Sequence, residues 1–427
     1  MMESPRFATL QDWLNWQETL HPVAIELGLE RVGRVADRLQ CRNPARVVIS
    51  VAGTNGKGSS VAMLEAILLR AGYRVGCYTS PHLLRYNERI RLAGEEVTDQ
   101  ALCDAFARVD AAREEESLTY FEFGTLAALD LMRREHLDVA LLEAGLGGRL
   151  DAVNIIDADA ALVTSIGIDH TDWLGADRAS IAREKAGILR AACPAVCGDA
   201  DPPRSLREVA ERTGADLRVL GQDFSLVEAA RGWHWQGGHS RYRDLPRPAL
   251  PGSHQLANAA AVLMLLDLLG ERLPVTEKSV RAGLQWIQLA GRVQRLPGRV
   301  EQVLDVSHNA QAAQALVDAL RRLPLAGRTH AVLGMMRDKD IEAFARVLDP
   351  LVSCWYPVGL AVERALPVEQ LSARLAAIAG AERVHACPTV TAAAGRLDSA
   401  ARPGDRVLVC GSFFTVAGWL TRQPQPD

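Results

Sequence analysis

The chain has 427 residues, of which 48% are hydrophobic and 23% are charged, and its formal net charge is −4. A chain of this length and composition can bury the core of an ordinary globular protein with two or three domains. The slight negative charge excludes a general attraction to nucleic acid or to an anionic membrane, so an anionic ligand must be met by a local cluster of groups.

The eight cysteines are scattered, and only Cys193 and Cys197 lie close together. No second cysteine or histidine pair follows them at zinc-site spacing, so we expect reduced, buried thiols rather than a zinc site or a disulfide framework. Residues 1–20 carry Glu3, Arg6 and further charges, which argues against a signal peptide. No window offers the roughly 18 apolar residues of a membrane span. We therefore expect a cytoplasmic protein without a membrane partner.

Short β-branched runs alternate with longer helical stretches between about residues 46 and 163. This alternation predicts a mostly parallel sheet with crossover helices. One helix is expected to begin near Lys57, because apolar residues recur at helical spacing after it and Gly72 stands where a stop is expected. The predicted strands are Val47–Val51, Val75–Tyr78, Val139–Leu142 and Ala160–Thr164.

The pattern changes between residues 223 and 250, where aromatic residues, glycines and prolines predict a small antiparallel excursion. Two helices are predicted next, at residues 253–269 and 276–286. Leu296-Pro297-Gly298 is the predicted boundary between a domain of residues 1–296 and one of residues 297–427, which begins a second strand–helix alternation. Its predicted strands are Val300–Val306, Thr329–Leu333, Val352–Tyr356 and Arg406–Cys410.

A glycine-rich loop separates the first predicted strand from the helix that follows, and it reads Gly53-Thr54-Asn55-Gly56-Lys57-Gly58-Ser59. Glycines let backbone N–H groups turn onto a phosphate, the helix N-terminus favours negative charge, and Lys57 can reach the terminal phosphates. Because Val51 stands where the first glycine of the common P-loop would be, and Gly58 separates the lysine from Ser59, a generic GTPase or ATPase is disfavoured. The loop predicts a nucleoside triphosphate site; a ligand-free turn is the alternative.

Polar side chains follow three of the predicted strands. Ser80 lies in Thr79-Ser80-Pro81-His82, Glu143 opens a glycine-rich stretch that reaches Asp151, and His170 lies in Ile168–Trp173. Since residues beyond the carboxyl ends of parallel strands converge on the ligand crevice, a hydroxyl, a carboxylate and an imidazole there can hold a divalent ion against the phosphates of ATP. The alternatives are a structural histidine and an ordinary tight turn.

Together these motifs resemble the signature of the folylpolyglutamate synthase family. The stretches Leu118–Glu122 and Asp169–Gly175 are similar to its bacterial bifunctional branch, the dihydrofolate synthase/folylpolyglutamate synthases of the Mur ligase superfamily. The resemblance implies an α/β fold, with a P-loop ATPase domain built on a mostly parallel sheet and a smaller Rossmann-like C-terminal domain. Further matching motifs are Leu27-Gly28-Leu29-Glu30-Arg31, Glu184-Lys185-Ala186-Gly187, Asp305-Val306-Ser307-His308-Asn309 and Gly411-Ser412-Phe413.

The resemblance also implies the activity. An ATP-dependent acid–amino-acid ligase, using Mg²⁺, would add L-glutamate to dihydropteroate to give dihydrofolate, and add further glutamates to reduced folates, through an acyl phosphate. The C-terminal domain would be the glutamate-ligase domain. We expect a monomer, because no exposed coiled coil is evident in the sequence.

The site residues follow from the same resemblance. It assigns Ser80, Glu143 and His170 to magnesium and catalytic roles to Lys57, His170 and Lys185, the last as N6-carboxylysine. The residues that it assigns to ATP are Gly53, Thr54, Asn55, Gly56, Lys57, Gly58, Ser59, Asn258, Arg292 and Asp305. Those that it assigns to the acceptor substrate are Ala24, Ile25, Glu26, Leu27, Thr119, Tyr120, Phe121, Glu122, Leu150, Asp151 and Ala152.

Several of these residues have plain structural alternatives. Asn258 could be satisfied locally on its helix, Arg292 could be a surface cation, and Lys185 an ordinary helix lysine. Tyr120 and Phe121 could stack on a flat ring or fill the core. For Asn309 we prefer the N-cap of the next helix.

Two other function classes fit part of the pattern. A peptidoglycan-type amino-acid ligase has a similar ATP core but carries a separate N-terminal nucleotide-sugar domain, for which the roughly 50 residues before the phosphate loop are too few. A P-loop ATPase switch or binding module needs the loop and the metal but no acceptor. Phosphate release that depends on an acceptor distinguishes a ligase from such a module.

Overall fold

The computed structural model describes residues 6–422, so the first five residues of the N-terminal stretch and the last five of the predicted C-terminal domain lie outside it. The chain forms two compact units. The first contains the residues up to Gly167, with Thr171–Ala249 and Leu256–Ile287. The second contains Ile168–His170, Leu250–Gln255 and the residues from Gln288 onward. The sequence-based boundary at residues 296 and 297 stays a prediction.

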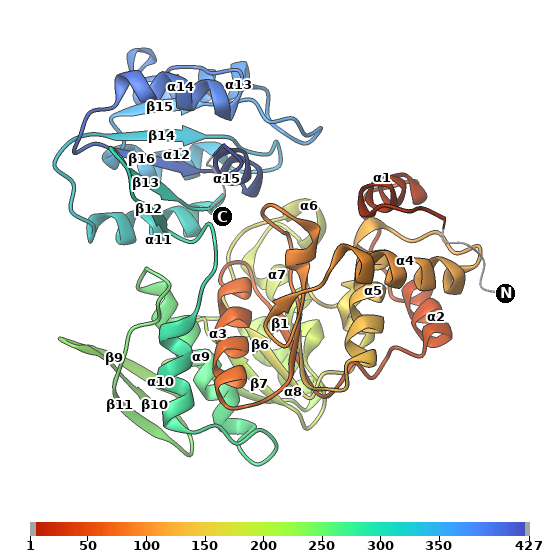
Figure 1. The fold of residues 1–427 in the computed structure, drawn as a ribbon. Coiled ribbons are helices and arrows are strands. Elements are labelled where there is room, and N and C mark those ends of the chain that lie inside the picture. The colour runs from red at the N-terminus through yellow and green to blue at the C-terminus, as the bar shows by residue number, and fades with distance from the viewer. Residues whose placement is uncertain (1–5, 423–427) are drawn as a thin grey trace. The chain divides into compact units, whose positions relative to one another are not determined.

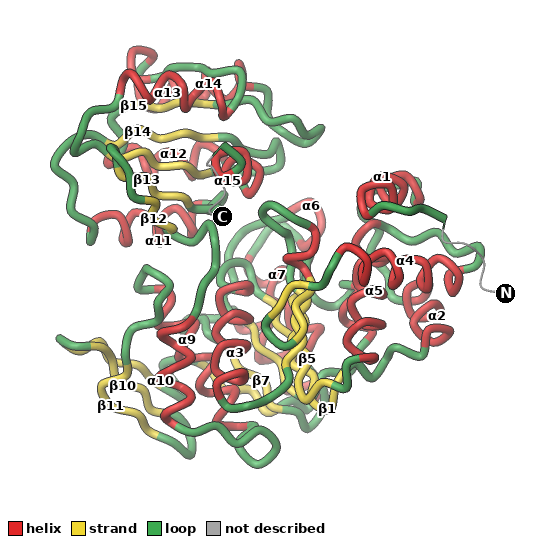
Figure 2. The backbone as a smooth tube through the Cα atoms, in the orientation of Figure 1, coloured by secondary structure: helices red, strands yellow, loops and turns green. Residues whose placement is uncertain are grey.

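The first unit is built on an eight-stranded sheet of order β4-β3-β2-β5-β1-β6-β7-β8. Strands β2, β5, β1, β6, β7 and β8 are parallel, whereas β3 and β4 add antiparallel pairs at one edge. Strands β1, β6 and β7 of this sheet are labelled in Figure 1, and β5 in Figure 2. Their bounds are β1 Ala45–Ala52, β2 Val75–Tyr78, β3 Ile90–Leu92, β4 Glu95–Glu96, β5 Leu137–Glu143, β6 Ala160–Val163, β7 Pro194–Cys197 and β8 Asp216–Val219.

Helices complete this unit. The predicted helix at Lys57 is confirmed as α3. An aromatic cluster of Trp13, Phe106 and Phe123 joins α1, α4 and α5 in the core. The α-helices are α1 Leu10–Leu20, α2 Glu30–Leu39, α3 Lys57–Arg70, α4 Asp99–Arg113, α5 Tyr120–Arg134, α6 Thr171–Leu174, α7 Arg178–Lys185, α8 Arg204–Thr213, α9 His254–Leu268 and α10 Glu277–Trp286. The 3₁₀ helices are η1 Tyr86–Arg89, η2 Ala152–Ile155 and η3 Ala186–Ile188.

A separate three-stranded antiparallel sheet of order β11-β10-β9 falls within the stretch predicted as an antiparallel excursion. Its strands are β9 Ser225–Ala229, β10 Gly232–Gln236 and β11 Arg241–Leu245. Trp235 of β10 is buried, and its indole N–H donates to the backbone oxygen of Ala260 at 3.1 Å. This hydrogen bond attaches the sheet to α9.

The second unit contains a five-stranded sheet of order β12-β13-β16-β14-β15, in which only β12 is antiparallel to its neighbour (Figure 1). Phe344 and Trp355 are fully buried in its core. The strands are β12 Gln294–Leu296, β13 Glu301–Leu304, β14 Thr329–Leu333, β15 Cys354–Pro357 and β16 Arg406–Cys410. The helices are α11 Ala310–Arg321, α12 Ile341–Leu348, η4 Asp349–Leu351, α13 Val368–Ala379, η5 Ala381–Arg383, α14 Val390–Ala400 and α15 Phe413–Leu420.

The two sheets and their helices confirm the predicted α/β fold, with a larger mostly parallel sheet and a smaller C-terminal α/β unit. The predicted strands are present, although β15 begins two residues after the predicted Val352 and β13 is shorter than predicted. Within residues 6–422, no helix combines the length and the apolar character that crossing a membrane requires.

Candidate functional site

The carboxyl ends of four neighbouring parallel strands carry the polar groups of the candidate site. In the order β2-β5-β1-β6, Ser80 lies beyond β2, Glu143 ends β5, Gly53 follows β1 and Thr164 follows β6. Because paired strands lie about 4.8 Å apart, these ends form one continuous edge. Ligands of open α/β sheets bind at such an edge.

The phosphate loop is fixed by the residues that follow β6. The Thr54 N–H donates to the Ser165 backbone oxygen at 2.7 Å, and the Asn55 N–H donates to the Ser165 hydroxyl at 3.1 Å. In the reverse direction, the Thr164 hydroxyl donates to the Asn55 backbone oxygen at 2.7 Å. The loop conformation is therefore held by its neighbours.

Two glycines of this loop are required by both conformation and space. Gly53 has φ +154°, and a Cβ there would lie 1.8 Å from the Thr164 hydroxyl. Gly56 has φ +91°, and a Cβ there would lie 2.6 Å from the Asn258 amide oxygen. Asn258 of α9 is thus brought directly against the phosphate loop, where the sequence predicts a nucleotide contact.

Lys57 begins α3, and its side chain turns back over the loop. Its ammonium donates to the backbone oxygens of Gly53 at 3.0 Å and Thr54 at 3.4 Å. The positive charge therefore lies with the N-terminal end of a helix, which already favours anions. This arrangement can hold the phosphates of a nucleotide.

Asp151 is a fully buried carboxylate that interacts electrostatically with Lys57. Burial raises its pKa to about 6, although backbone N–H donors and the Lys57 charge act in the opposite direction. One carboxylate oxygen accepts the Leu146 N–H at 2.8 Å and the other accepts the Val153 N–H at 3.1 Å. Asp151 thereby shapes the loop that carries Leu150 and Ala152, its two neighbours in the predicted acceptor set.

Two of the three predicted magnesium residues are adjacent. The Ser80 N–H donates to the buried Glu143 carboxylate at 3.3 Å, which places a hydroxyl and a carboxylate together beside the loop. These oxygen donors fit Mg²⁺, which usually takes one or two protein carboxylates together with substrate phosphates and water. Accordingly, the described residues contain no group of three His, Cys, Asp or Glu side chains arranged as a metal cage. His170, the third predicted residue, belongs to the second unit and has φ +52°.

Lys185 is the last residue of α7 and is only 3% exposed. The glycine-rich loop after β5 packs against this helix end, since a Cβ on Gly148 would lie 3.0 Å from the Lys185 backbone oxygen. The lysine therefore lies close to the loop that leads to Asp151.

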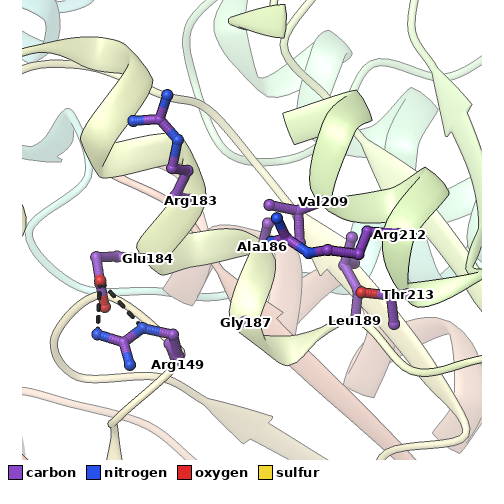
Figure 3. A pocket seen from close by; sticks show the side chains of 9 residues that line it. All are labelled: Arg149, Arg183, Glu184, Ala186, Gly187, Leu189, Val209, Arg212 and Thr213. Atoms are coloured by element: carbon purple, nitrogen blue, oxygen red, sulfur yellow. Dashed lines mark hydrogen bonds and ion pairs between the residues drawn. The ribbon is translucent and has the colours of Figure 1, made fainter. Parts of the chain in front are cut away.

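A pocket of about 440 Å³ is lined by residues that precede and follow Lys185 in the chain (Figure 3). The Arg149 guanidinium lies 2.9 Å from the Glu184 carboxylate. Figure 3 shows this pair with Arg183 above it, whereas Arg212 lies apart, near Val209 and Thr213. Arg183 and Arg212 lie in the last turns of α7 and α8, where cations offset the negative helix end. The lining residues are Arg149, Arg183, Glu184, Ala186, Gly187, Leu189, Val209, Arg212 and Thr213, none of which is a predicted site residue.

The predicted acceptor residues at the start of α5 have structural contacts of their own. Thr119 caps the helix: its hydroxyl accepts the Glu122 N–H at 3.3 Å, and the Glu122 carboxylate accepts the Thr119 N–H at 2.8 Å. Tyr120 and Phe121 are both half-buried. Phe121 lies 5.9 Å from the ring of Tyr78, and Tyr120 lies 5.8 Å from that of Tyr86.

In the second unit, Asp305 and Arg292 lie on adjoining segments. The Asp305 carboxylate is buried and accepts the Val293 and Ser307 N–H groups, each at 2.9 Å. The Arg292 guanidinium lies 5.3 Å from the centre of the Phe413 ring. The preferred capping role of Asn309 is confirmed, because its amide oxygen accepts the Ala312 N–H at the start of α11.

A buried ion pair in the same unit was not foreseen from the sequence. The Lys339 ammonium lies 2.6 Å from the Asp169 carboxylate, and the two side chains are 8% and 9% exposed. Burial alone would raise the pKa of Asp169, but the His308 hydrogen bond and the Lys339 charge hold it well below its usual range. The Asn309 amide also donates to Asp169 at 3.1 Å.

Sequence reasoning also missed Thr164 and Ser165, which hold the phosphate loop, and Arg31, which contacts both Glu26 and Glu122. Thr164 and Ser165 could have been found from the sequence, because these two hydroxyl residues directly follow an apolar strand at the ligand-binding edge of the sheet. Arg31 lies in a motif that matches the family, but nothing in the sequence indicates its contact with Glu122, which spans 91 positions.

Known proteins with the same sequence patterns cover nearly the whole chain. The family model "Mur ligase middle domain" matches residues 51–266, and "Mur ligase, glutamate ligase domain" matches residues 291–413. The Escherichia coli dihydrofolate synthase/folylpolyglutamate synthase is 44% identical over 408 residues, covering 96% of this chain and 94% of the relative.

Solved structures agree in fold. E. coli FolC in complex with DHPP and ADP superposes with a TM-score of 0.92 at 44% identity, covering 97% of each chain. A bifunctional folylpolyglutamate synthase/dihydrofolate synthase with Mn, AMPPNP and L-glutamate bound gives 0.90 at 45% identity, covering 97% of this chain and 98% of that one. The chain therefore belongs to the dihydrofolate synthase/folylpolyglutamate synthase family of Mur ligases, which are ATP-dependent ligases that form carbon–nitrogen bonds.

Proposed function

We propose that this chain joins L-glutamate to dihydropteroate, giving dihydrofolate, and adds further glutamates to reduced folates, in each case through an acyl phosphate made from ATP. The observation that carries the proposal is the phosphate loop with Lys57, beside the paired Ser80 and Glu143, at one sheet edge. Relatives with DHPP, nucleotide and L-glutamate bound support this choice of substrates.

The reaction needs activation because a carboxylate is a poor electrophile. In the first step the acceptor carboxylate attacks the γ-phosphorus of ATP, and ADP leaves. Lys57 and the loop N–H groups hold the phosphates and stabilise the charge that shifts toward ADP. In the second step the amine of L-glutamate attacks the acyl phosphate, inorganic phosphate leaves, and the amine loses a proton.

Magnesium is the proposed metal, held by Ser80, Glu143 and His170. When bound, it neutralises charge on the phosphates of ATP. Lys185 is proposed to be N6-carboxylysine, a modification that turns a buried cation into an anion. Native intact mass spectrometry at neutral pH and the electron density at Lys185 test this together, since the modification adds one carbon dioxide; a Lys185 that is unmodified by both measurements in fully active enzyme would remove it from the mechanism.

The remaining site residues are proposed in the roles that the family resemblance implies. Asn258, Arg292 and Asp305 are proposed nucleotide contacts. The proposed acceptor contacts are the residue groups 24–27, 119–122 and 150–152. Residues 1–296 are proposed as the ATP-binding domain and residues 297–427 as the glutamate-ligase domain.

The testing experiment measures phosphate release and product mass with ATP, Mg²⁺ and L-glutamate. Dihydropteroate, tetrahydrofolate and no acceptor are compared in parallel. We expect products one glutamate heavier from both acceptors, and phosphate release only when an acceptor is present.

The other outcomes separate the alternatives. Product from tetrahydrofolate alone would reduce the proposal to a chain-extending synthase. Phosphate release without any acceptor would favour the P-loop ATPase module, and activity only with peptidoglycan precursors would favour the amino-acid ligase.

A further inference from the structure

Two segments that are far apart in the sequence carry most of the proposed acceptor contacts. Residues 24–27 lie in the stretch 21–29, which joins α1 to α2 without regular secondary structure. Residues 119–122 begin α5. No helix or strand ladder fixes the first segment, so its shape depends on side-chain contacts.

Arg31, in the first turn of α2, contacts both segments. Its Nε donates to the two carboxylate oxygens of Glu122 at 2.9 and 3.0 Å. Its Nη2 donates to the backbone oxygen of Glu26 at 2.9 Å, and its Nη1 pairs with the Glu26 carboxylate. One planar guanidinium therefore holds the irregular segment and the start of α5 in a fixed relation.

The two carboxylate partners of Arg31 make further hydrogen bonds to neighbouring residues. Glu122 is only 3% exposed, and its carboxylate also accepts the N–H and the hydroxyl of Thr119, each at 2.8 Å. Glu26 is 2.8 Å from Nε2 of His21, whose Nδ1 lies 2.9 Å from the Ser117 hydroxyl. A continuous set of hydrogen bonds therefore runs from the irregular segment to the helix.

We propose that Arg31 is a positioning residue for the folate acceptor, which it orients by holding residues 24–27 and 119–122 together. This rests on the proposed function, because it assumes that these two segments bind dihydropteroate or a folate. The Glu122 carboxylate is engaged by Arg31 and Thr119, and the Glu26 carboxylate by Arg31 and His21, so these two groups shape the acceptor site through Arg31.

A purely structural role for Arg31 is the competing explanation. Loss of a buried ion-pair partner destabilises a fold wherever it occurs. The two explanations differ in which kinetic constant changes. A positioning role affects the acceptor KM, because misplaced groups weaken acceptor binding while the phosphate loop is untouched.

Arg34 provides a matched control. It lies one helical turn after Arg31 on the same helix, and its guanidinium donates to Glu116 at 2.6 and 3.0 Å. Its side chain is 54% exposed, against 14% for Arg31, and its partner precedes the predicted acceptor segment. Arg34→Ala therefore removes a similar ion pair from the same helix but leaves the acceptor segments connected.

The experiment measures KM for dihydropteroate, KM for ATP, and kcat at saturating acceptor in the full-length protein with Mg²⁺. We expect Arg31→Ala to raise the dihydropteroate KM at least about 10-fold, with kcat and the ATP KM within about twofold of the unchanged protein. The dihydropteroate KM of Arg31→Lys should lie between those of the unchanged protein and of Arg31→Ala, since one ammonium cannot reproduce the planar contacts of the guanidinium. Arg34→Ala should leave all three constants within about twofold.

Glu26→Gln supplies a variant for which folding is not in question, because Glu26 is half exposed. It keeps the side-chain shape but removes the charge that Arg31 meets, and we expect a smaller rise in the dihydropteroate KM. Equal constants for the Arg31 and Arg34 variants, or parallel losses in kcat and both KM values that follow the fall in Tm, would overturn the positioning role. Failure of the proposed function looks different, since the unchanged protein would then form no glutamate adduct.

Discussion

The phosphate loop and the acceptor segments of the first unit are held in place by different means. The loop takes its shape from backbone hydrogen bonds to the end of β6 and from glycines that no other residue can replace without strain or collision. The acceptor segments take theirs from side chains, with Arg31 joining Glu26 to Glu122. The proposed nucleotide site is therefore shaped by the backbone, whereas the shape of the proposed acceptor segments depends on a few ion pairs. Four substitutions, the last two compared as a pair, sharpen or break this comparison, from the largest expected effect to the smallest.

Lys57→Ala should lower turnover at least about 100-fold, because one electrostatic partner of the transferring phosphoryl group is lost. The hydrogen bonds of its ammonium go to backbone oxygens of the loop itself, and its charge interacts with Asp151. Because Thr164 and Ser165 also hold the loop, the loop should keep its conformation. Acceptor-dependent phosphate release measures the effect, and an unchanged circular dichroism spectrum and Tm are the control. Near-normal turnover would remove the phosphate-site assignment.

Asp151→Asn should change how stability depends on pH. The pKa of Asp151 is about 6 in the folded protein against an ordinary value of 3.8. Between these values the folded protein keeps a proton that the unfolded chain has released, so this group's contribution to stability falls as the pH rises from about 4 to 6. The full difference between the two pKa values corresponds to a loss of roughly 2–3 kcal/mol in the free energy of unfolding, at 1.36 kcal/mol per pKa unit.

Urea denaturation at a series of pH values tests this expectation. The amide of the Asp151→Asn variant would lose one backbone hydrogen bond at every pH, so the informative quantity is the change in the stability difference between the two proteins, not its absolute value. The difference should shift in favour of Asp151→Asn between pH 4 and 6 and then level off. A constant difference across this range would contradict a raised pKa at Asp151.

Gly56→Ala and Gly72→Ala form a matched pair with φ of +91° and +92°. A Cβ at Gly72 meets nothing within 4 Å, so we expect only the cost of the left-handed conformation, about 1–2 kcal/mol of stability. A Cβ at Gly56 also meets Asn258, so we expect in addition a rise in the ATP KM of about 10-fold, with the dihydropteroate KM unchanged. Equal ATP KM values for the two variants would show that the Asn258 contact is unimportant.

Whether a feature could be predicted from the sequence depends on whether neighbouring or distant residues determine it. The strand before the phosphate loop, the helix from Lys57, and the places of Ser80 and Glu143 at the ends of β2 and β5 are set by neighbours in the chain, and the structure contains these elements. His170, the third predicted magnesium residue, lies instead in the second unit. The pairing of Ser80 with Glu143 depends on β2 and β5 being neighbours in the sheet, an order that the alternation of strands and helices does not predict.

The features that were missed depend on long-range packing. The antiparallel β12 is three residues long, too short for a periodic signal. The Arg31–Glu122 and Lys339–Asp169 contacts span 91 and 170 positions, and no local pattern marks an arginine or lysine that will be buried. The roles of the individual site residues came from the family resemblance, since residue type and spacing alone left structural alternatives open.

The Asp169–Lys339 pair has a consequence for how the chain is made. The second unit includes residues 168–170 and 250–255, which leave the ribosome well before its sheet from β12 onward exists. The second unit therefore cannot fold completely from the C-terminal part of the chain alone, because it also contains these two earlier segments. A recombinant fragment starting at Gln288 would likewise bury the Lys339 ammonium without Asp169. The second unit is therefore compact in space, but we do not expect it to fold as an isolated fragment.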